Sequence, residues 1–314
     1  MPSNRPNLAI IGPGRVGRAL GRRLHQRGWR IGAVVSHTTQ HARAATRVIG
    51  AGRPQACLDA NLLAADVVLI TTPDRSIAAV AIELARLDGK TVGRGGARQG
   101  RNVRARQERG EWTGKVVLHT NGALDRSVLK PLERLGAATG SLHPLQTFSG
   151  RGLPPLDGCI CALEGTPAAL RAARRICRDL GCLPVVIARG AKPAYHAAGA
   201  LAAGHILAVI EAATRMLVSL GFSRRAAVSA LLPLTRQTLE NFERLGPRPS
   251  SHPAWTGPLA RGDFATVAKH AAALRRFPRE YRDAYAALSR LAWLVLGQGS
   301  RATSRRLQHS LRIR

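Results

Sequence analysis

Acidic residues are scarce in this sequence. Only 18 of the 314 residues are Asp or Glu, against 48 Lys and Arg, which gives a formal net charge of +30 at pH 7. Aromatic residues are also few, at 4% of the chain. Nucleic-acid-binding surfaces typically combine clustered cations with aromatic side chains, whereas here the arginines are spread along the chain. We interpret most of the charge as a solvated surface, whose field attracts anionic substrates and phosphorylated cofactors.

Cysteine is present without the spacing of a metal site or a disulfide framework. The five cysteines are an odd number and contain no C-x-x-C pair. We therefore expect reduced thiols and no zinc site. The chain also lacks an uninterrupted apolar run of bilayer length, and the polar residues 1–7 lead into a strand without a signal-like segment. These absences predict a cytoplasmic protein without membrane association.

The most informative segment is present near the start of the chain. Residues 8–17 read Leu-Ala-Ile-Ile-Gly-Pro-Gly-Arg-Val-Gly, an apolar run followed by G-x-G-x-x-G. In a dinucleotide-binding turn, Gly12 makes the bend, Gly14 admits the pyrophosphate and Gly17 lets the next helix pack on the sheet. The backbone N–H groups at the helix N-terminus then face the phosphates. The alternative is a tight turn that binds no ligand.

The end of the second predicted strand, residues 29–36, bears on the choice of cofactor. Binders selective for NAD usually place an Asp or Glu there, which grips the ribose 2′-hydroxyl. This chain has Ser36 and His37 instead, followed by Arg43. The absent carboxylate and the nearby cations favour a 2′-phosphate, hence NADP, with NAD as the alternative.

Further cofactor contacts are expected where later strands end. The strand at residues 66–72 ends in Thr72-Pro73-Asp74, and the strand at 115–119 is followed by Asn121. Asp74 is equally well explained as a helix N-cap, and Asn121 as a turn residue beside Gly122. The predicted cofactor-binding residues are Gly12, Pro13, Gly14, Arg15, Val16, Gly17, Ser36, His37, Arg43, Thr72, Pro73, Asp74 and Asn121.

Alternating strand-like and helix-like segments continue to Gly190, after which the chain is rich in Ala and Leu with helical periodicity. The pattern predicts an α/β Rossmann domain with a doubly wound parallel sheet, followed by an all-α domain. We place the Rossmann domain at residues 1–190, with an Arg- and Gly-rich insertion at 93–111. The helical domain is placed at 191–299, and a basic, disordered tail at 300–314. Nucleic-acid binding through the insertion and the tail is a less favoured alternative.

The order of motifs resembles a known family. The motifs are the glycine fingerprint, Thr72-Pro73-Asp74, residues 119–123 (His-Thr-Asn-Gly-Ala), residues 141–145 (Ser-Leu-His-Pro-Leu), residues 195–198 (Tyr-His-Ala-Ala) and residues 256–263 (Thr-Gly-Pro-Leu-Ala-Arg-Gly-Asp). Together they resemble bacterial Rossmann-like proteins with the C-terminal domain of unknown function 2520. Those proteins are described as NADP-dependent oxidoreductases related to pyrroline-5-carboxylate reductase, ketopantoate reductase and 6-phosphogluconate dehydrogenase.

The resemblance implies a helical domain of the 6-phosphogluconate dehydrogenase type, often dimer-forming, and an active site in the cleft between the domains. We therefore expect a homodimer. Two positions depart from the family: members often have Ser at the position of Asn121, and a frequent Asn corresponds to Gly204. The second departure puts a role for an amide at that position in doubt.

Hydride transfer needs a proton donor or acceptor beside the reacting carbon. In the related hydroxyacid dehydrogenases, a Lys near the start of the helical domain has this role. Lys192 and His196 are four residues apart, so both lie on one face if the helix reaches back to Lys192. The alternative is a solvated Lys and a structural His. His143 precedes a proline at a strand end, and it either faces the nicotinamide or packs in a turn.

The substrate is expected to contact Arg261, Asp263 and Tyr195. Arg261 can clamp a carboxylate or phosphate, whereas Asp263 can equally be the N-cap of a helix starting near Phe264. The sequence thus predicts an NADP-dependent oxidoreductase acting on a small, anionic carbonyl, hydroxyl or imine compound. A catalytically silent NADP-binding sensor or scaffold is the alternative, and a deazaflavin as the hydride partner stays open.

Overall fold

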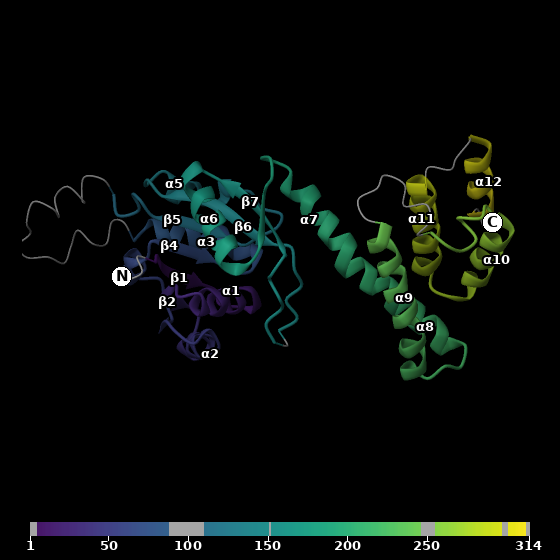
Figure 1. Ribbon diagram of the computed structural model, residues 1–314, viewed down its shortest axis with the longest axis horizontal. Coiled ribbons are helices and arrows are strands. Elements are labelled where there is room, and N and C mark those ends of the chain that lie inside the picture. Colours follow the sequence, from purple (N-terminus) through teal and green to yellow (C-terminus); the bar gives the residue numbers. More distant parts are fainter. Residues whose placement is uncertain (1–4, 88–109, 151, 246–254, 297–300, 312–314) are drawn as a thin grey trace, which may run out of the picture. The chain divides into compact units, whose positions relative to one another are not determined.

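A computed structural model of the chain describes residues 5–87, 110–150, 152–245, 255–296 and 301–311 (Figure 1). The predicted insertion at 93–111 lies outside the described residues, apart from its last two positions. The chain divides into two compact units, Met1–Ala203 and Gly204–Arg314. Each unit is described by itself.

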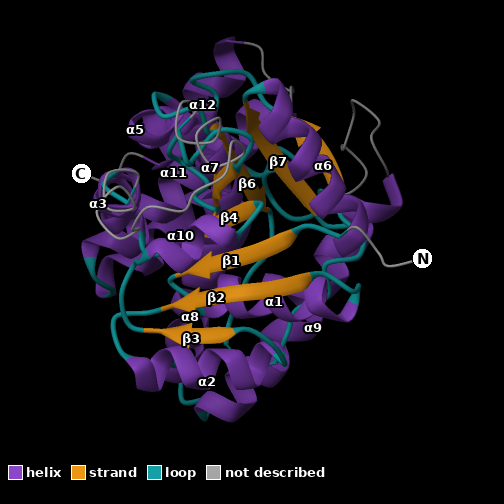
Figure 2. Cartoon of the chain, turned by 90° about the vertical axis from the view of Figure 1, so that its left-hand side faces the viewer, coloured by secondary structure: helices purple, strands orange, loops and turns teal. Residues whose placement is uncertain are grey.

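The first unit is built on one eight-stranded sheet with the order β3-β2-β1-β4-β5-β6-β7-β8. All neighbouring pairs are parallel except β6 and β7. Figure 2 shows β1, β2 and β3 running side by side in one direction. This order confirms the predicted Rossmann-type sheet. The strands are β1 (Asn7–Ile11), β2 (Arg30–Val35), β3 (Arg53–Gln55), β4 (Val67–Ile70), β5 (Val116–His119), β6 (Ala138–Pro144), β7 (Ile160–Gly165) and β8 (Leu183–Val186).

Helices cover both faces of this sheet, and each face has its own core. In β1, Leu8 and Ile10 belong to the core that includes residues of α1 (Arg15–Gln26) and α6 (Pro167–Leu180). Ala9 and Ile11 belong to the core on the opposite face of the sheet. A strand buried on both faces needs such a continuous apolar run. The other helices described in this unit are α2 (Thr39–Ile49), α3 (Asp74–Ala85), α5 (Lys130–Glu133) and α7 (Lys192–Ala200), with short 3₁₀ helices at Ala60–Ala64 and Arg126–Leu129.

The glycine fingerprint joins β1 to α1, as its spacing predicts. Gly12 has a φ of +73°, and a Cβ there would lie 2.3 Å from Cγ2 of Thr72. A Cβ on Gly17 would lie 2.3 Å from the Thr71 hydroxyl oxygen, which is 2.7 Å from the Gly12 carbonyl oxygen and donates to it. The end of β4 therefore packs directly on the turn, and only glycine fits at these two positions.

In its described part the second unit is helical. A π-helical turn, Leu201–His205, joins α7 to α8 (Ile206–Ser219). The other helices are α9 (Arg224–Leu245), α10 (Phe264–Ala273), α11 (Arg279–Leu296) and α12 (Arg301–Leu311), with a 3₁₀ turn at Leu274–Arg276. The continuous helix Lys192–Ser219 is long and apolar enough to cross a membrane by length and composition, with a mean hydropathy of 1.5. Polar residues interrupt that stretch, so it escapes a search for an uninterrupted apolar run.

The tail differs from the sequence expectation. Residues 301–311 form α12 where a disordered terminus is predicted. Leu307 is 2% exposed and packs in an apolar cluster with Phe264, Val267 and Trp293, and Leu311 lies against the same cluster. Leu307 and Leu311 are four residues apart, so they share one helix face. Packing of this face stabilises a helix that charge density alone disfavours.

We expect Gly12→Ala to lower the free energy of unfolding by about 2–3 kcal/mol, because it adds left-handed backbone strain and a clash with the Thr72 backbone. Gly14→Ala is the matched control. Gly14 has ordinary backbone geometry, and its added Cβ would meet only the Gly12 carbonyl oxygen, at 3.9 Å. Urea unfolding of both variants measures the difference, and equal stability would contradict the packing described here.

Candidate functional site

The predicted site residues of the first unit gather where the parallel strands end. Gly12 follows β1, Thr72 follows β4, Asn121 follows β5, and His143 lies in the last two residues of β6. Ligands of open α/β sheets bind at the carboxyl ends of the strands. This edge is therefore the candidate site.

The turn after β1 fits a dinucleotide. α1 has no side-chain cap and no acidic residue in its first turn, so its N-terminal N–H groups are left for a ligand. Gly14 is exposed, and the space around its missing Cβ is open. The Thr72 hydroxyl beside Gly12 is buried and has no hydrogen-bond partner among the described residues. A buried hydroxyl without a hydrogen-bond partner in the protein indicates that a bound ligand supplies one.

The end of β2 carries no carboxylate, as expected for NADP. Thr38 caps α2 and accepts the backbone N–H of His41 at 3.2 Å. The ring of His37 lies edge-on to that of His41, with centroids 6.3 Å apart. Arg43 is exposed on the following helix. The side chains that follow Ser36, up to Arg43, thus include imidazoles and a guanidinium, and none is a carboxylate.

Lys192 starts a helix that also carries His196, as predicted, and its side chain is buried, unlike the solvated alternative. α7 begins at Lys192, so the helix reaches back as required, but the side chain is 0% exposed. Its ammonium donates to the Asn121 carbonyl oxygen at 2.6 Å and to the Ser141 hydroxyl at 2.7 Å. Burial lowers the pKa of Lys192 to about 8, with partial compensation from the carboxylates of Glu164 and Asp125. An ammonium committed to two protein acceptors acts through its neighbours, so we interpret Lys192 as a positioning residue.

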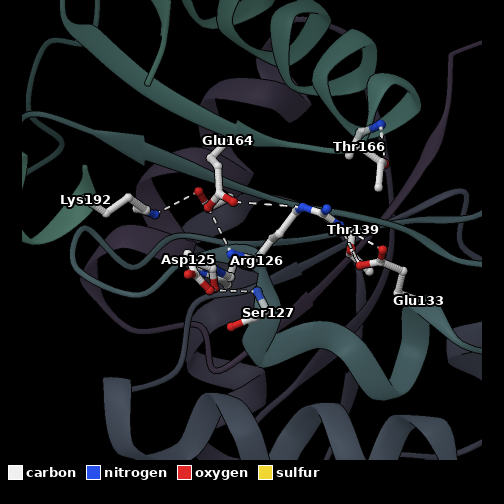
Figure 3. Close-up of polar contacts among 11 residues, drawn as sticks. Asp125, Arg126, Ser127, Glu133, Thr139, Glu164, Thr166 and Lys192 are labelled. Atoms are coloured by element: carbon white, nitrogen blue, oxygen red, sulfur yellow. Dashed lines mark hydrogen bonds and ion pairs between the residues drawn. The ribbon is translucent and has the colours of Figure 1, made fainter. Parts of the chain in front are cut away.

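Glu164 is a part of this site that the sequence did not reveal. It is 6% exposed and lies opposite Ser141 in the antiparallel β6–β7 pair. Its carboxylate accepts the backbone N–H of Arg126 at 2.9 Å, and the Arg126 guanidinium also binds Glu133 (Figure 3). A charged residue inside a buried strand is the one sequence signal that could have found Glu164. The position of Glu164 opposite Ser141 follows only from the pairing of β6 with β7.

The exposed side of the site contains two imidazoles and a phenol. His143 Nδ1 and the Tyr195 hydroxyl oxygen are 2.9 Å apart. The His143 and His196 rings meet edge to face, with centroids 5.9 Å apart. A Cβ on Gly122 would lie 2.5 Å from His196 Cδ2 and 2.8 Å from His143 Nε2. The glycine at 122 therefore allows these two rings to share the space above the loop.

Burial and the Lys192 charge keep the imidazoles of His143 and His119 neutral. Burial, followed by Lys192 and His196, lowers the pKa of His143 to about 4. The pKa of His119 falls to about 3 for the same two leading reasons, burial and Lys192. His119 Nδ1 accepts the Asn121 backbone N–H at 3.2 Å, and its Nε2 lies 3.2 Å from the Asp125 carbonyl oxygen. Sequence analysis missed His119, which holds the loop whose carbonyl binds Lys192.

Other predicted residues have local structural partners. The Asn121 side-chain oxygen accepts the N–H groups of Ala123, at 2.7 Å, and Leu124, at 2.5 Å, which is the turn chemistry considered for it. Asp74 is the first residue of α3 and Pro73 is the N-cap, which corrects the N-cap alternative for Asp74.

Arg261 and Asp263 lie in the second unit, so they are described apart from the edge of the sheet. Asp263 caps α10 by accepting the Thr266 N–H at 3.1 Å and the Thr266 hydroxyl at 2.7 Å. The N-cap alternative for Asp263 is therefore observed.

Comparison with family models identifies both halves of the chain. Residues 7–92 match the model described as NADP oxidoreductase, coenzyme F420-dependent, and residues 159–292 match the domain of unknown function 2520. These two segments are thus similar to an NADP oxidoreductase domain and a DUF2520 domain, in that order. This combination confirms the family resemblance and the predicted cofactor class.

Solved structures share the fold of the whole chain. Protein TM1727 of Thermotoga maritima is 23% identical, with a TM-score of 0.64 over 92% of this chain and 98% of that one. A Bacteroides fragilis protein described as an NADP oxidoreductase is 20% identical, with a TM-score of 0.68 and the same coverage. A reductive aminase of Aspergillus terreus, solved with NADPH and ethyl-5-oxohexanoate, is 16% identical, with a TM-score of 0.60 over 98% and 99%. No curated protein matches the chain.

Replacing Lys192 tests its electrostatic role. We expect Lys192→Met to raise the pKa of His143 from about 4, because a positive charge that disfavours imidazolium is removed. Burial remains, so the pKa should stay below the ordinary value of 6.5. NMR titration of the imidazole signals measures the shift. Lys130→Met, which removes an exposed lysine on α5, is the control, and an unmoved His143 in Lys192→Met would refute the assignment.

Proposed function

We propose that this protein is an NADP-dependent reductase that acts on a small, anionic carbonyl or imine compound, with the reverse oxidation of a hydroxyl compound by the same groups. The observation that carries the proposal is the Tyr195–His143 pair, 2.9 Å apart at the carboxyl edge of the sheet. A phenol and an imidazole at the edge that also carries the dinucleotide turn support a proton donor there. The matched NADP oxidoreductase domain supports the cofactor.

NADPH, when bound, supplies the hydride, and the chain supplies the proton. Burial raises the pKa of Tyr195 to about 12, so its hydroxyl is protonated at neutral pH. Tyr195 gives this proton to the oxygen or nitrogen that gains charge as the carbonyl or imine carbon is reduced. His143 is neutral at that pH and, as the Nδ1–H tautomer, donates to the phenolate that forms. Solvent then restores the proton of Tyr195.

Lys192 and His119 prepare this pair without touching the reacting atoms. The Lys192 charge disfavours protonation of His143, so the imidazole keeps its neutral form over the physiological range. Its bonds to the Asn121 carbonyl and the Ser141 hydroxyl join the loop after β5 and strand β6 to the start of α7, three residues before Tyr195. The preference for an anionic substrate is supported by the net charge of +30.

Two variants separate binding from chemistry. Tyr195→Phe should lower kcat by roughly 10²–10⁴, the usual size of a lost acid. NADPH affinity should stay within about two-fold, because the variant removes only the hydroxyl that is assigned to the reacting atom of the substrate. Gly14→Val should weaken NADPH binding, because it fills the open space at the turn. NADPH oxidation with 2-ketoacids, cyclic imines and aldehydes measures kcat, fluorescence titration measures affinity, and a deazaflavin is included as an alternative hydride partner.

The outcomes are distinct. An unchanged kcat in Tyr195→Phe would exclude Tyr195 as the acid. Tight NADPH binding without turnover of any compound class would favour the sensor alternative. Failure of both NADPH and NADH to bind below millimolar concentration would overturn the proposed function itself.

The same proposal includes a homodimer formed through the second unit. Large apolar side chains on α8 and α9 are exposed, among them Leu207 at 67%, Leu234 at 64% and Phe242 at 63%. Only 6% of the apolar window in Lys192–Ser219 is buried. Surfaces of this kind on a soluble fold mark an interface. Glu211 of α8 binds Arg215 and Arg224, and this charged network favours a protein partner over a lipid bilayer.

We expect the double variant Leu207→Glu/Leu234→Glu to be monomeric where the parent chain is dimeric, because two carboxylates would have to be buried in each copy. Ile82→Glu on α3, where the side chain is also exposed, is the control and should stay dimeric. Sedimentation-velocity ultracentrifugation measures the mass. A monomeric parent, or a dimeric double variant, would contradict this interface.

A further inference from the structure

The outer face of α1 carries a second concentration of positive charge, which starts beside the glycine turn and continues along the helix. Arg15, Arg18 and Arg22 follow one another at spacings of three and four, which places them on one side of the helix. They line a hollow of about 630 Å³. Its other lining residues are Val48, Ser149, Gly150, Gly152 and Leu153. Cavities of 300–1,000 Å³ are of the size that binds small molecules.

Each of these guanidinium groups is held by a backbone carbonyl. Arg18 Nε donates to the Pro13 oxygen at 2.9 Å, and Arg22 Nη1 donates to the Val48 oxygen at 2.9 Å. Arg15 Nη1 donates to the Phe148 oxygen at 3.3 Å. A carbonyl fixes a side chain without neutralising its charge. Among the described residues, none of the three arginines forms an ion pair with a carboxylate.

The loop that closes the hollow is shaped to approach α1. Gly150 has a φ of +83°, and a Cβ there would lie 3.0 Å from Arg15 Nε. The loop backbone therefore comes close to the guanidinium at a position where glycine is favoured. The result is three guanidinium groups on one side of the hollow, each held by a backbone carbonyl and none paired with a carboxylate among the described residues, with Ser149, Gly150, Gly152 and Leu153 on the other side. Planar forks of this kind bind phosphate oxygens in a bidentate manner.

The hollow adjoins the dinucleotide turn at Arg15 and Arg18 and continues beyond it to Arg22 and Val48. α2 begins at Thr39, next to the carboxyl end of β2, and Val48 lies in its last turn. The hollow therefore extends along α1 away from the carboxyl edge of the sheet, where the cofactor is expected. Arg15, the first residue of α1, is its one lining residue in the predicted cofactor site.

From this geometry we infer a second anion site, in which Arg15, Arg18 and Arg22 bind a compact phosphorylated ligand. Two kinds of ligand could supply the phosphate for these arginines: the bound dinucleotide, or a separate phosphorylated small molecule. The inference is for the second kind, because Arg18, Arg22 and Val48 lie along the helix beyond the turn. It does not depend on the redox reaction.

Inorganic pyrophosphate is the probe, measured by calorimetry on the full chain in the presence of saturating NADPH. We expect one bound pyrophosphate per chain, weakened at least 10-fold in Arg18→Gln/Arg22→Gln. The control is Arg171→Gln/Arg174→Gln on α6, which removes two exposed arginines and so loses the same net charge. Its affinity should stay within two-fold of the parent. NADPH affinity should also stay within two-fold in both variants.

Val48→Glu tests the site without removing an arginine. It places a carboxylate on the lining of the hollow, at a residue that is 38% exposed, and should weaken pyrophosphate at least 10-fold in a chain that keeps its melting temperature. Equal weakening in the α6 control would show that the attraction is general. Loss of pyrophosphate binding when NADPH saturates would assign the phosphate chemistry to the dinucleotide. Either result, or full affinity in Val48→Glu, overturns the inference.

Discussion

The buried ammonium of Lys192 is the interaction on which the candidate site depends. It joins three segments that are distant in sequence: the loop after β5 through the Asn121 carbonyl, strand β6 through the Ser141 hydroxyl, and α7, which starts at Lys192 itself. A buried charge is costly unless it is fully hydrogen-bonded. Because the acceptors and the helix start must all be in place to solvate it, the ammonium fixes the start of α7 against the ends of β5 and β6.

The electrostatics of the imidazoles follow from the same charge. His119 and His143 lie at the ends of neighbouring strands, and Lys192 adds to the burial that lowers the pKa of each. Glu164 offsets part of the cost to Lys192 from the opposite side. The site is thus a buried ammonium partly compensated by two carboxylates, with the neutral imidazoles of His119 and His143 beside it. Tyr195 is the proposed proton donor, and its partner His143 is neutral, so the pair carries no charge before the proton is transferred.

The sequence allowed the backbone of the first unit to be predicted because its signals are local. The glycine turn is specified by ten residues, and α6 is bounded by its own N-cap, Thr166, and by Gly181 at its C-terminus. The partners of Lys192 were not predictable in this way. Ser141 precedes it by 51 residues and Asn121 by 71, and Glu164 faces Ser141 only through the antiparallel pairing of β7. The helical tail was missed because Leu307 gains its partners from α10 and α11.

Lys192 and the exposed apolar side chains of α8 share one continuous helix, Lys192–Ser219. Its first turn is fixed by polar bonds to the Rossmann unit, and its later turns present apolar groups that the described chain leaves exposed. A change that frees the ammonium removes an anchor at one end of the helix. Tyr195 follows Lys192 by three residues on the same helix, so the bonds of the ammonium also set the position of the Tyr195 hydroxyl beside His143.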